Sequence, residues 1–179
     1  EDKLKTMKSA LDTYLRTNNR LPCPAVGTAA AGAASYGVEA SSCSPSSCPS
    51  GMVCGTGSVR GALPFVTLGL TNAYGDDEWV SKISYVVDNL FTQTDSNCES
   101  PGALSVVDYN DNSVSTSAAY ILISHGIDGA GGYKKNVGTY ASCNTTYKDG
   151  ENCDADDVFR VSEIKPTPTT TTDYFDDVV

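Results

Sequence analysis

Among the residues whose types could do chemistry, the chain has a single histidine, His125, which directly follows Ser124. A serine nucleophile needs an imidazole within about 3 Å and a carboxylate that orients the imidazole. Adjacency in the sequence does not provide this geometry, so we expect His125 to have a structural or hydrogen-bonding role. No other catalytic set is present in the sequence, and we therefore predict that the protein is not an enzyme.

A glycine-rich segment follows His125 and contains Gly126, Gly129, Gly131 and Gly132. A phosphate-binding loop would end in Gly-Lys-Ser or Gly-Lys-Thr, and this segment does not. The segment therefore predicts a turn in which glycines adopt positive φ, and not a nucleotide site.

An acidic segment near the C-terminus is the candidate metal site. Its carboxylates lie within nine residues: Asp149, Glu151, Asp154, Asp156 and Asp157. Carboxylates at alternate positions, with Gly150 to turn the backbone, provide the hard oxygen ligands that Ca²⁺ prefers. The spacing is not that of an EF-hand loop, and the alternative is a solvated acidic loop. The 108–112 segment is a weaker candidate of the same kind, and Ca²⁺ is the only cofactor that the sequence indicates.

Composition limits the partners and the compartment. The 179 residues include 12 Lys and Arg against 22 Asp and Glu, giving a net charge of -10, so no nucleic-acid partner is expected. Seven cysteines with a single His favour disulfides in an oxidising compartment over metal binding. No signal peptide and no apolar run of about 18 residues is present, so we expect any targeting or membrane segment to have been removed.

The cysteine spacing suggests three disulfides and one free thiol. Cys143 and Cys153 flank a turn-rich segment and are paired on that ground. A bond between Cys43 and Cys48 would close a small loop, and a bond between Cys23 and Cys54 would tie the end of the first helix to the 61–64 segment. This pairing leaves Cys98 unpaired.

An amphipathic helix is predicted over residues 3–17, because apolar side chains recur at steps of three and four residues. These side chains are Leu4, Met7, Leu11, Tyr14 and Leu15. The helix ends at Asn18 and Asn19, which tolerate left-handed geometry, and Pro22 cannot continue it. The stripe is already in phase at Leu4 without a preceding cap, so we expect residue 1 to be a cut within a longer helix. The alternative is an ordinary N-terminal helix that covers a small core.

The remaining elements predict an α+β fold with a single domain, 1–179. Strands are expected at 82–88, 103–109, 118–124 and 158–164, where β-branched and aromatic residues gather. No helical segment separates the later strands, which indicates one antiparallel meander packed on the helix. We expect a helix over 1–19, a long connection over 20–78, the sheet over 79–164, and a Thr/Pro-rich tail over 165–179. The apolar residues that end the tail are expected to dock back on the domain: Tyr174, Phe175, Val178 and Val179.

Several motifs occur in a consistent order along the chain. They are Arg20-Leu21-Pro22-Cys23-Pro24 directly after the helix, the segment 61–70, Asp77-Glu78-Trp79 followed by 83–87, the segment 120–126, and the terminal 175–179. In this order the chain resembles the bacterial type IV pilin-like proteins made with a prepilin-type N-terminus. The resemblance implies a long N-terminal helix packed on an antiparallel sheet, an αβ-loop over 20–78, and a C-terminal region bounded by cysteines. Some pilin-like domains similar to this one bind Ca²⁺ in a C-terminal loop.

The resemblance also implies a function, a partner and a location. The protein would be a structural subunit, a major or minor pilin, that assembles with identical or related subunits into a type IV pilus-like filament. Assembly would use the hydrophobic front half of the helix, absent here, which would anchor the subunit in the inner membrane beforehand. The stripe residues that are present would face partly the sheet and partly other subunits, and so serve assembly as well: Leu4, Met7, Leu11, Tyr14 and Leu15. The expected location is the periplasmic side of the envelope before assembly and the cell surface afterwards. A pseudopilin of a type II secretion system and a secreted adhesin or ligand-binding module remain as alternatives.

Overall fold

The computed structural model describes residues 2–94, 100–136, 141–142, 145–146, 148–161 and 177–178. Its α-helix, α1 (Asp2–Asn18), confirms the helix expected over 3–17. Asn19 follows with a φ of 50°, the left-handed geometry that ends the helix as predicted. Within the described residues, no helix is both long and apolar enough to cross a bilayer.

A five-stranded main sheet occupies the centre of the molecule, in the order β1-β2-β3-β6-β8. Its strands are β1 (Val53–Cys54), β2 (Ser58–Ala62), β3 (Ser84–Asp88), β6 (Tyr120–Ser124) and β8 (Asp177–Val178). All neighbouring strands in this sheet are antiparallel. The pairing of β8 with β6 brings Val178 against the core, as expected for the tail. Tyr174, Phe175 and Val179 lie outside the described residues.

A second, three-stranded sheet has the order β5-β4-β7. It comprises β4 (Leu104–Val107), β5 (Ser113–Ala118) and β7 (Val158–Arg160). Strands β4 and β5 form an antiparallel hairpin, whereas β7 pairs parallel to β4. The α+β class is therefore confirmed, but the expectation of one antiparallel meander is wrong. Leu104 on β4 packs against the second face of the main sheet, in a cluster with Val86 and Ile121.

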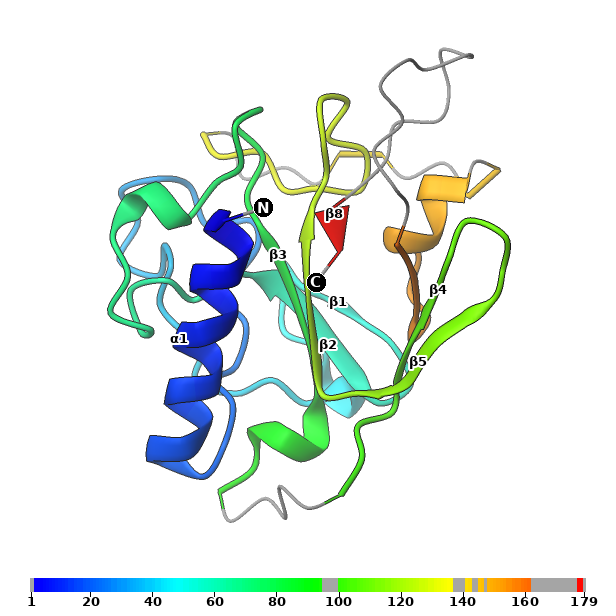
Figure 1. The fold of residues 1–179 in the computed structure, drawn as a ribbon. Helices are drawn as coiled ribbons and strands as arrows, with labels where there is room; N and C mark the ends of the chain where they lie inside the picture. Colours follow the sequence, from blue (N-terminus) through cyan, green and yellow to red (C-terminus); the bar gives the residue numbers. More distant parts are fainter. Residues whose placement is uncertain are drawn as a thin grey trace.

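The main sheet is buried on both faces, which gives the domain three layers (Figure 1). On β3, Tyr85 and Val87 belong to the core cluster that includes the α1 residues Leu4, Met7 and Leu11. Val86 points the other way, into a cluster with residues of the small sheet, as the two-residue period of a strand requires. Helix α1 therefore covers one face and the small sheet covers the other.

The connection between α1 and β3 is long and partly irregular. It includes the strands β1 and β2, which the sequence did not predict, and the short 3₁₀ helices η1 (Pro45–Ser47) and η2 (Asn72–Tyr74). The backbones of Ala25 and Ala62 exchange two hydrogen bonds of 2.9 Å, so the connection runs along β2 soon after the helix ends. Two further 3₁₀ helices are described: η3 (Asn89–Thr92) directly follows β3, and η4 (Lys148–Asn152) directly precedes β7.

Candidate functional site

The apolar stripe of α1 packs mainly on the chain's own sheet. Leu4, Met7 and Leu11 are buried, and Leu15 packs partly against the same cluster. Tyr14 is half-buried and donates a 3.0 Å hydrogen bond to Glu39 Oε1. Three of the five residues expected to serve assembly are therefore buried against the chain's own sheet.

Beside α1 lies a groove of about 640 Å³, between the helix and the segment that leads to η2. The groove is lined mainly by small and hydroxylated helix residues and by two leucines: Lys5, Thr6, Ser9, Ala10, Thr13, Tyr14, Thr17, Asn18, Leu68 and Leu70. Among the described residues that line the groove, Lys5 is the one that carries a charge. This surface lies next to the buried stripe of α1.

The described disulfides differ from the predicted pairs. Cys23 bonds to Cys43 and Cys48 bonds to Cys54, so the predicted pairs Cys43–Cys48 and Cys23–Cys54 are wrong. All four cysteines are nevertheless bonded, and both bonds lie within the connection after α1. The strand β1 explains the difference, because it holds Cys54 near Cys48, with 5.9 Å between their Cα atoms.

Cys153 is also disulfide-bonded. The prediction that pairs it with Cys143, and the prediction that leaves Cys98 free, fall on residues outside the described ones.

An ion pair between Arg20 and Glu39 fixes the connection to the end of α1. Arg20 donates to both carboxylate oxygens of Glu39 at 2.9 and 3.0 Å, and the backbone N–H of Cys23 donates to Oε2 at 3.1 Å. Burial alone would raise the pKa of Glu39, but these hydrogen bonds and the Arg20 charge hold it below its usual value. The guanidinium also lies 5.5 Å from the centre of the Tyr14 ring.

The carboxylates of the acidic segment point to different partners. Asp157 accepts hydrogen bonds from Gly57 N and Ser58 Oγ, and Glu151 Oε2 lies 3.5 Å from Arg160. Among the residues with described side chains, no three His, Cys, Asp or Glu side chains come together as metal ligands. The side chain of Asp149 lies outside the described set, so the calcium site stays a prediction.

Within the described part of the acidic segment, Asp154 interacts most strongly with its neighbour Asp156. Burial, followed by repulsion from Asp156, raises the pKa of Asp154 to about 6. A carboxylate pair without a neutralising cation costs free energy whenever both members are ionised.

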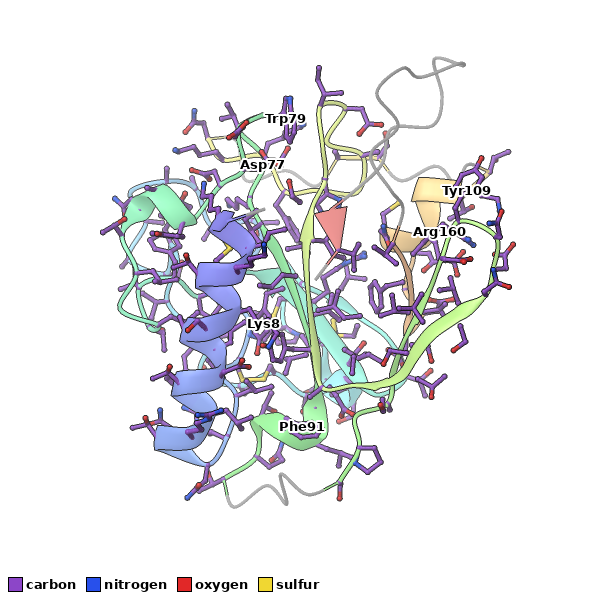
Figure 2. The ribbon with its side chains drawn as sticks, in the orientation of Figure 1. Lys8, Asp77, Trp79, Phe91, Tyr109 and Arg160 are labelled. Atoms are coloured by element: carbon purple, nitrogen blue, oxygen red, sulfur yellow. A yellow bond between two sulfur atoms is a disulfide. The ribbon has the colours of Figure 1, made fainter. Side chains whose placement is uncertain are left out.

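The weaker calcium candidate, 108–112, already has cationic partners. Arg160 donates to Asp111 Oδ1 at 2.6 Å and to the carbonyl of Asp108 at 2.7 Å, and Lys148 Nζ lies 3.4 Å from Asp111 Oδ2. Figure 2 labels Tyr109 and Arg160 at this end of the small sheet. These contacts secure the β4–β5 turn to the segment around η4.

His125 is buried and its partner is not the adjacent serine. Its Nε2 lies 2.8 Å from the hydroxyl of Ser84 on β3, and neither residue has exposed surface. Ser124 instead donates to Asp77 Oδ2 at 3.2 Å. This geometry provides a buried cross-link between β3 and the segment after β6.

The glycine turn has the predicted conformation. Gly126, Gly129 and Gly131 have φ values of 57°, 61° and 71°. A Cβ on Gly131 would lie 2.0 Å from Cβ of Cys153, so the close approach of these two segments also requires glycine.

A turn at 77–81 is the feature that the sequence did not identify as a site. Asp77 Oδ1 accepts hydrogen bonds from the backbone N–H groups of Trp79 at 3.0 Å and Ser81 at 2.9 Å. Asp77 N donates to the carbonyl of Ser81 at 2.7 Å. Burial raises the pKa of Asp77 above its usual value despite the N–H groups that favour its ionised form. One carboxylate thus organises the whole turn.

This turn presents two large apolar side chains to solvent. Trp79 is 45% exposed and Val80 is 52% exposed. Val80 has a φ of 65°, which for a β-branched residue costs about 1–3 kcal/mol. Asp77 and Trp79 lie at the end of the molecule where α1 begins (Figure 2). We call Trp79 and Val80 the tip.

The signal that could have located the tip is a tryptophan in a polar turn, directly after two carboxylates and away from any apolar periodicity. Comparisons of the chain with protein-family models, with curated proteins and with solved structures find no match.

Proposed function

We propose that this chain is a subunit, a major or minor pilin, of a type IV pilus-like filament on a bacterial cell envelope. The observation that supports the proposal is the placement of α1 on one face of an antiparallel sheet, followed by a long, disulfide-stapled connection back to that sheet. The resemblance implies this order: N-terminal helix, αβ-loop and sheet. The disulfides favour an oxidising compartment outside the cytoplasm.

The partners in this proposal are identical or related subunits. A hydrophobic segment ahead of α1 holds the subunit in the inner membrane on the periplasmic side and later forms the filament core. The globular domain contributes smaller contacts, because a net charge of -10 makes the surfaces of two copies repel each other.

Antibodies raised against residues 1–179 test this function on the cells that produce the protein. Filaments are sheared from the cells, purified and examined by electron microscopy with immunogold. Labelling along the filaments is expected for a major subunit, and sparse labelling for a minor one. A strain without the gene serves as the control for antibody specificity. Antigen confined to the soluble secreted fraction would overturn the proposal.

A secreted binding module is the second candidate, and a groove of about 480 Å³ favours it. Arg20 and Glu39 lie at one side of this groove, and the serine-rich 41–44 segment beside the Cys23–Cys43 disulfide contributes polar groups. A pseudopilin would instead stay in the periplasm, and loss of the gene would reduce protein secretion. Assigning the antigen to sheared filaments, to the periplasm or to the soluble secreted fraction therefore separates all three functions.

A further inference from the structure

We propose that the end of the domain at which α1 begins docks on the surface of a phospholipid bilayer, with the tip and Ile127 in contact with lipid. This inference rests on the proposed filament function, because that function places the segment ahead of α1 in the inner membrane. It adds a second contact between the subunit and the membrane, made by the folded domain itself.

The exposed apolar residues at this end come from two neighbouring turns. The tip belongs to the 77–81 turn, and Ile127, which is 64% exposed, belongs to the glycine-rich turn after β6. The segments that follow the two turns are bonded to each other, because Lys82 N donates to the carbonyl of Tyr133 at 2.8 Å. Both turns reach past the start of α1 (Figure 1). A flat surface that meets this end of the domain therefore meets both turns.

The position of α1 determines which surface that is. Lys3, in the first turn of α1, donates to the backbone carbonyl of Asp76, so the helix begins beside the turn that carries the tip. In the proposed function, the hydrophobic segment that continues this helix towards its N-terminus lies in the bilayer. The end of the domain beside that segment then faces the bilayer, and the layer of lipid headgroups is what covers the tip.

The tip has the chemistry of an interfacial contact. An indole has an apolar body and a polar N–H, and tryptophan is enriched at the level of the headgroups in membrane proteins. Trp79 is the only tryptophan of the chain, and it is held outward in a turn organised by Asp77. Val80 keeps a φ of 65° while more than half of it is exposed, so its own domain gains little packing from this strained conformation. Strain at an exposed apolar turn points to a role outside the domain.

Two lysines beside the tip suit the headgroup layer. Lys134 Nζ lies 3.4 Å from Ser81 Oγ, and no ion pair among the described residues includes it, so its ammonium can donate to a lipid phosphate. Lys135 Nζ lies 2.5 Å from Asp76 Oδ2 and neutralises that buried carboxylate. The base of the tip therefore adds no uncompensated negative charge.

Apolar contact, and not charge, carries the docking. Glu78 and Asp128 are exposed carboxylates at this end, and the whole chain carries a net charge of -10, so attraction to anionic lipids is weak. The tip and Ile127 are also too small to hold a free domain on a bilayer, since even a single acyl chain binds only marginally. The membrane segment keeps the domain at a high effective concentration beside the bilayer, which makes so small a contact effective.

The fluorescence of Trp79 on tethered domains tests the docking. Residues 1–179 with a hexahistidine tag ahead of Glu1 are bound to phosphatidylcholine vesicles that contain a nickel-chelating lipid, so the tether takes the place of the membrane segment. Because Trp79 is the only tryptophan, the signal reports the tip alone. Vesicles whose acyl chains carry bromine should quench Trp79 relative to vesicles without bromine. The emission should also lie at shorter wavelength than that of the untethered domain.

A second position for the tryptophan provides the control. Combining Trp79→Phe with Leu90→Trp moves the sole tryptophan to η3, where Figure 2 labels Phe91 at the end of the molecule opposite to Trp79. Leu90 is 62% exposed, so this indole is also open to solvent. Bromine should leave its fluorescence unchanged. Equal quenching at the two positions would refute the docking, since lipid would then contact the domain without preference.

Variants beside Trp79 make the test specific. Val80→Glu combined with Ile127→Glu places two carboxylates in the contact and should abolish the quenching of Trp79. Val114→Glu changes an exposed valine of β5, in the small sheet, and should leave the quenching unchanged. The quenching should persist in about 0.5 M NaCl, because salt screens charges but does not weaken apolar contact. Unquenched Trp79 in the wild type, quenching in the double variant, or loss of quenching in salt would overturn the proposal.

The vesicle measurement and the immunogold labelling can fail independently. Absence of the protein from filaments would refute the proposed function, while the tether still measures the contact between the tip and lipid. Labelled filaments together with an unquenched Trp79 would leave the function standing and refute the docking. A shift to shorter wavelength without quenching would show that protein, and not lipid, covers the tip, which contradicts the docking as well.

Discussion

Replacing Asp154 with Asn should raise the free energy of unfolding at neutral pH. In the folded protein, burial and the neighbouring Asp156 carboxylate both disfavour the ionised form of Asp154, and its pKa rises from 3.8 to about 6. The Asn variant keeps the shape and the hydrogen-bonding capacity of the side chain but carries no charge. It therefore removes both the desolvation cost and the repulsion.

The magnitude follows from the pKa shift. One pKa unit corresponds to about 1.4 kcal/mol, so the full shift would correspond to about 3 kcal/mol. Asp154 is only partly buried, and solvent screens its interaction with Asp156. After this discount we expect a gain of about 1 kcal/mol for Asp154→Asn.

The gain should depend on pH with a defined sign. Because the folded pKa of Asp154 is raised above the unfolded value, the folded state binds the proton more readily. The cost of Asp154 is therefore fully present above pH 6 and disappears as the pH falls through about 6 towards 3.8. The difference between the wild type and Asp154→Asn should be largest at pH 7.5 and close to zero near pH 3.5.

Urea denaturation at these two pH values measures the effect, in buffer with a chelator. Asp111→Asn is the matched control of opposite sign, since the hydrogen bond and the charge of Arg160 lower the pKa of Asp111. At pH 7.5 this control should be less stable than the wild type. The difference in the free energy of unfolding should shrink as the pH falls through the folded pKa of Asp111. A loss of stability in Asp154→Asn at pH 7.5 would refute the reasoning. Repeating the urea denaturation in millimolar Ca²⁺ tests the predicted metal site, because a calcium ligand at Asp154 would make the Asn variant less stable than the wild type.

Three further substitutions have defined outcomes in the same urea assay. Leu11→Ala should cost about 3–5 kcal/mol because it leaves a cavity in the core, and Leu15→Ala should cost clearly less; equal losses would contradict the burial of α1 described above. Joint replacement of Cys23 and Cys43 by Ser should cost about 3 kcal/mol through loop entropy, and peptide mapping without reduction should recover this pair in the wild type. Val80→Gly should raise stability by about 1 kcal/mol by relieving strain, and a loss would show that the valine side chain contributes to the fold.

Much of α1 and of the central strands could be predicted from local pattern. The period of Leu4, Met7 and Leu11 predicts the buried face of the helix, and the run that contains Tyr85 and Val87 predicts a central strand. These signals are local because one element repeats its period over several residues.

The strand β2 could not be predicted in this way. It contains Ser58 and Arg60, polar residues that the structure buries. Arg60 donates hydrogen bonds of 2.6 and 2.8 Å to the carbonyls of Asn152 and Cys153, some ninety residues later in the chain. Since the compensation for burying this charge comes from a distant segment, the local sequence of β2 does not indicate a strand.

The acidic segment could not be predicted for the same reason, whereas the disulfide pairing depends on local backbone structure. The pairing of Cys48 with Cys54 depends on the short strand β1 and not on the number of residues between cysteines. The Asp157 carboxylate binds the β1–β2 turn through Gly57, a partner that the acidic sequence pattern does not reveal. For Asp157, a partner 100 residues away in the sequence decides the role of the side chain.

In the proposed filament, tension would reach the domain through α1, and the Cys23–Cys43 disulfide would then have a mechanical consequence. Tension applied to the helix reaches the chain at Arg20, only a few residues before the first bonded sulfur. The bond spans a sequence separation of 20, which fully extended at about 3.4 Å per residue measures about 70 Å. Because the two Cα atoms are 5.6 Å apart in the folded state, the chain would otherwise lengthen here by about 60 Å. Because covalent bonds carry the force past this span, a pulled subunit cannot lengthen there. Single-molecule extension should therefore gain this length only after chemical reduction.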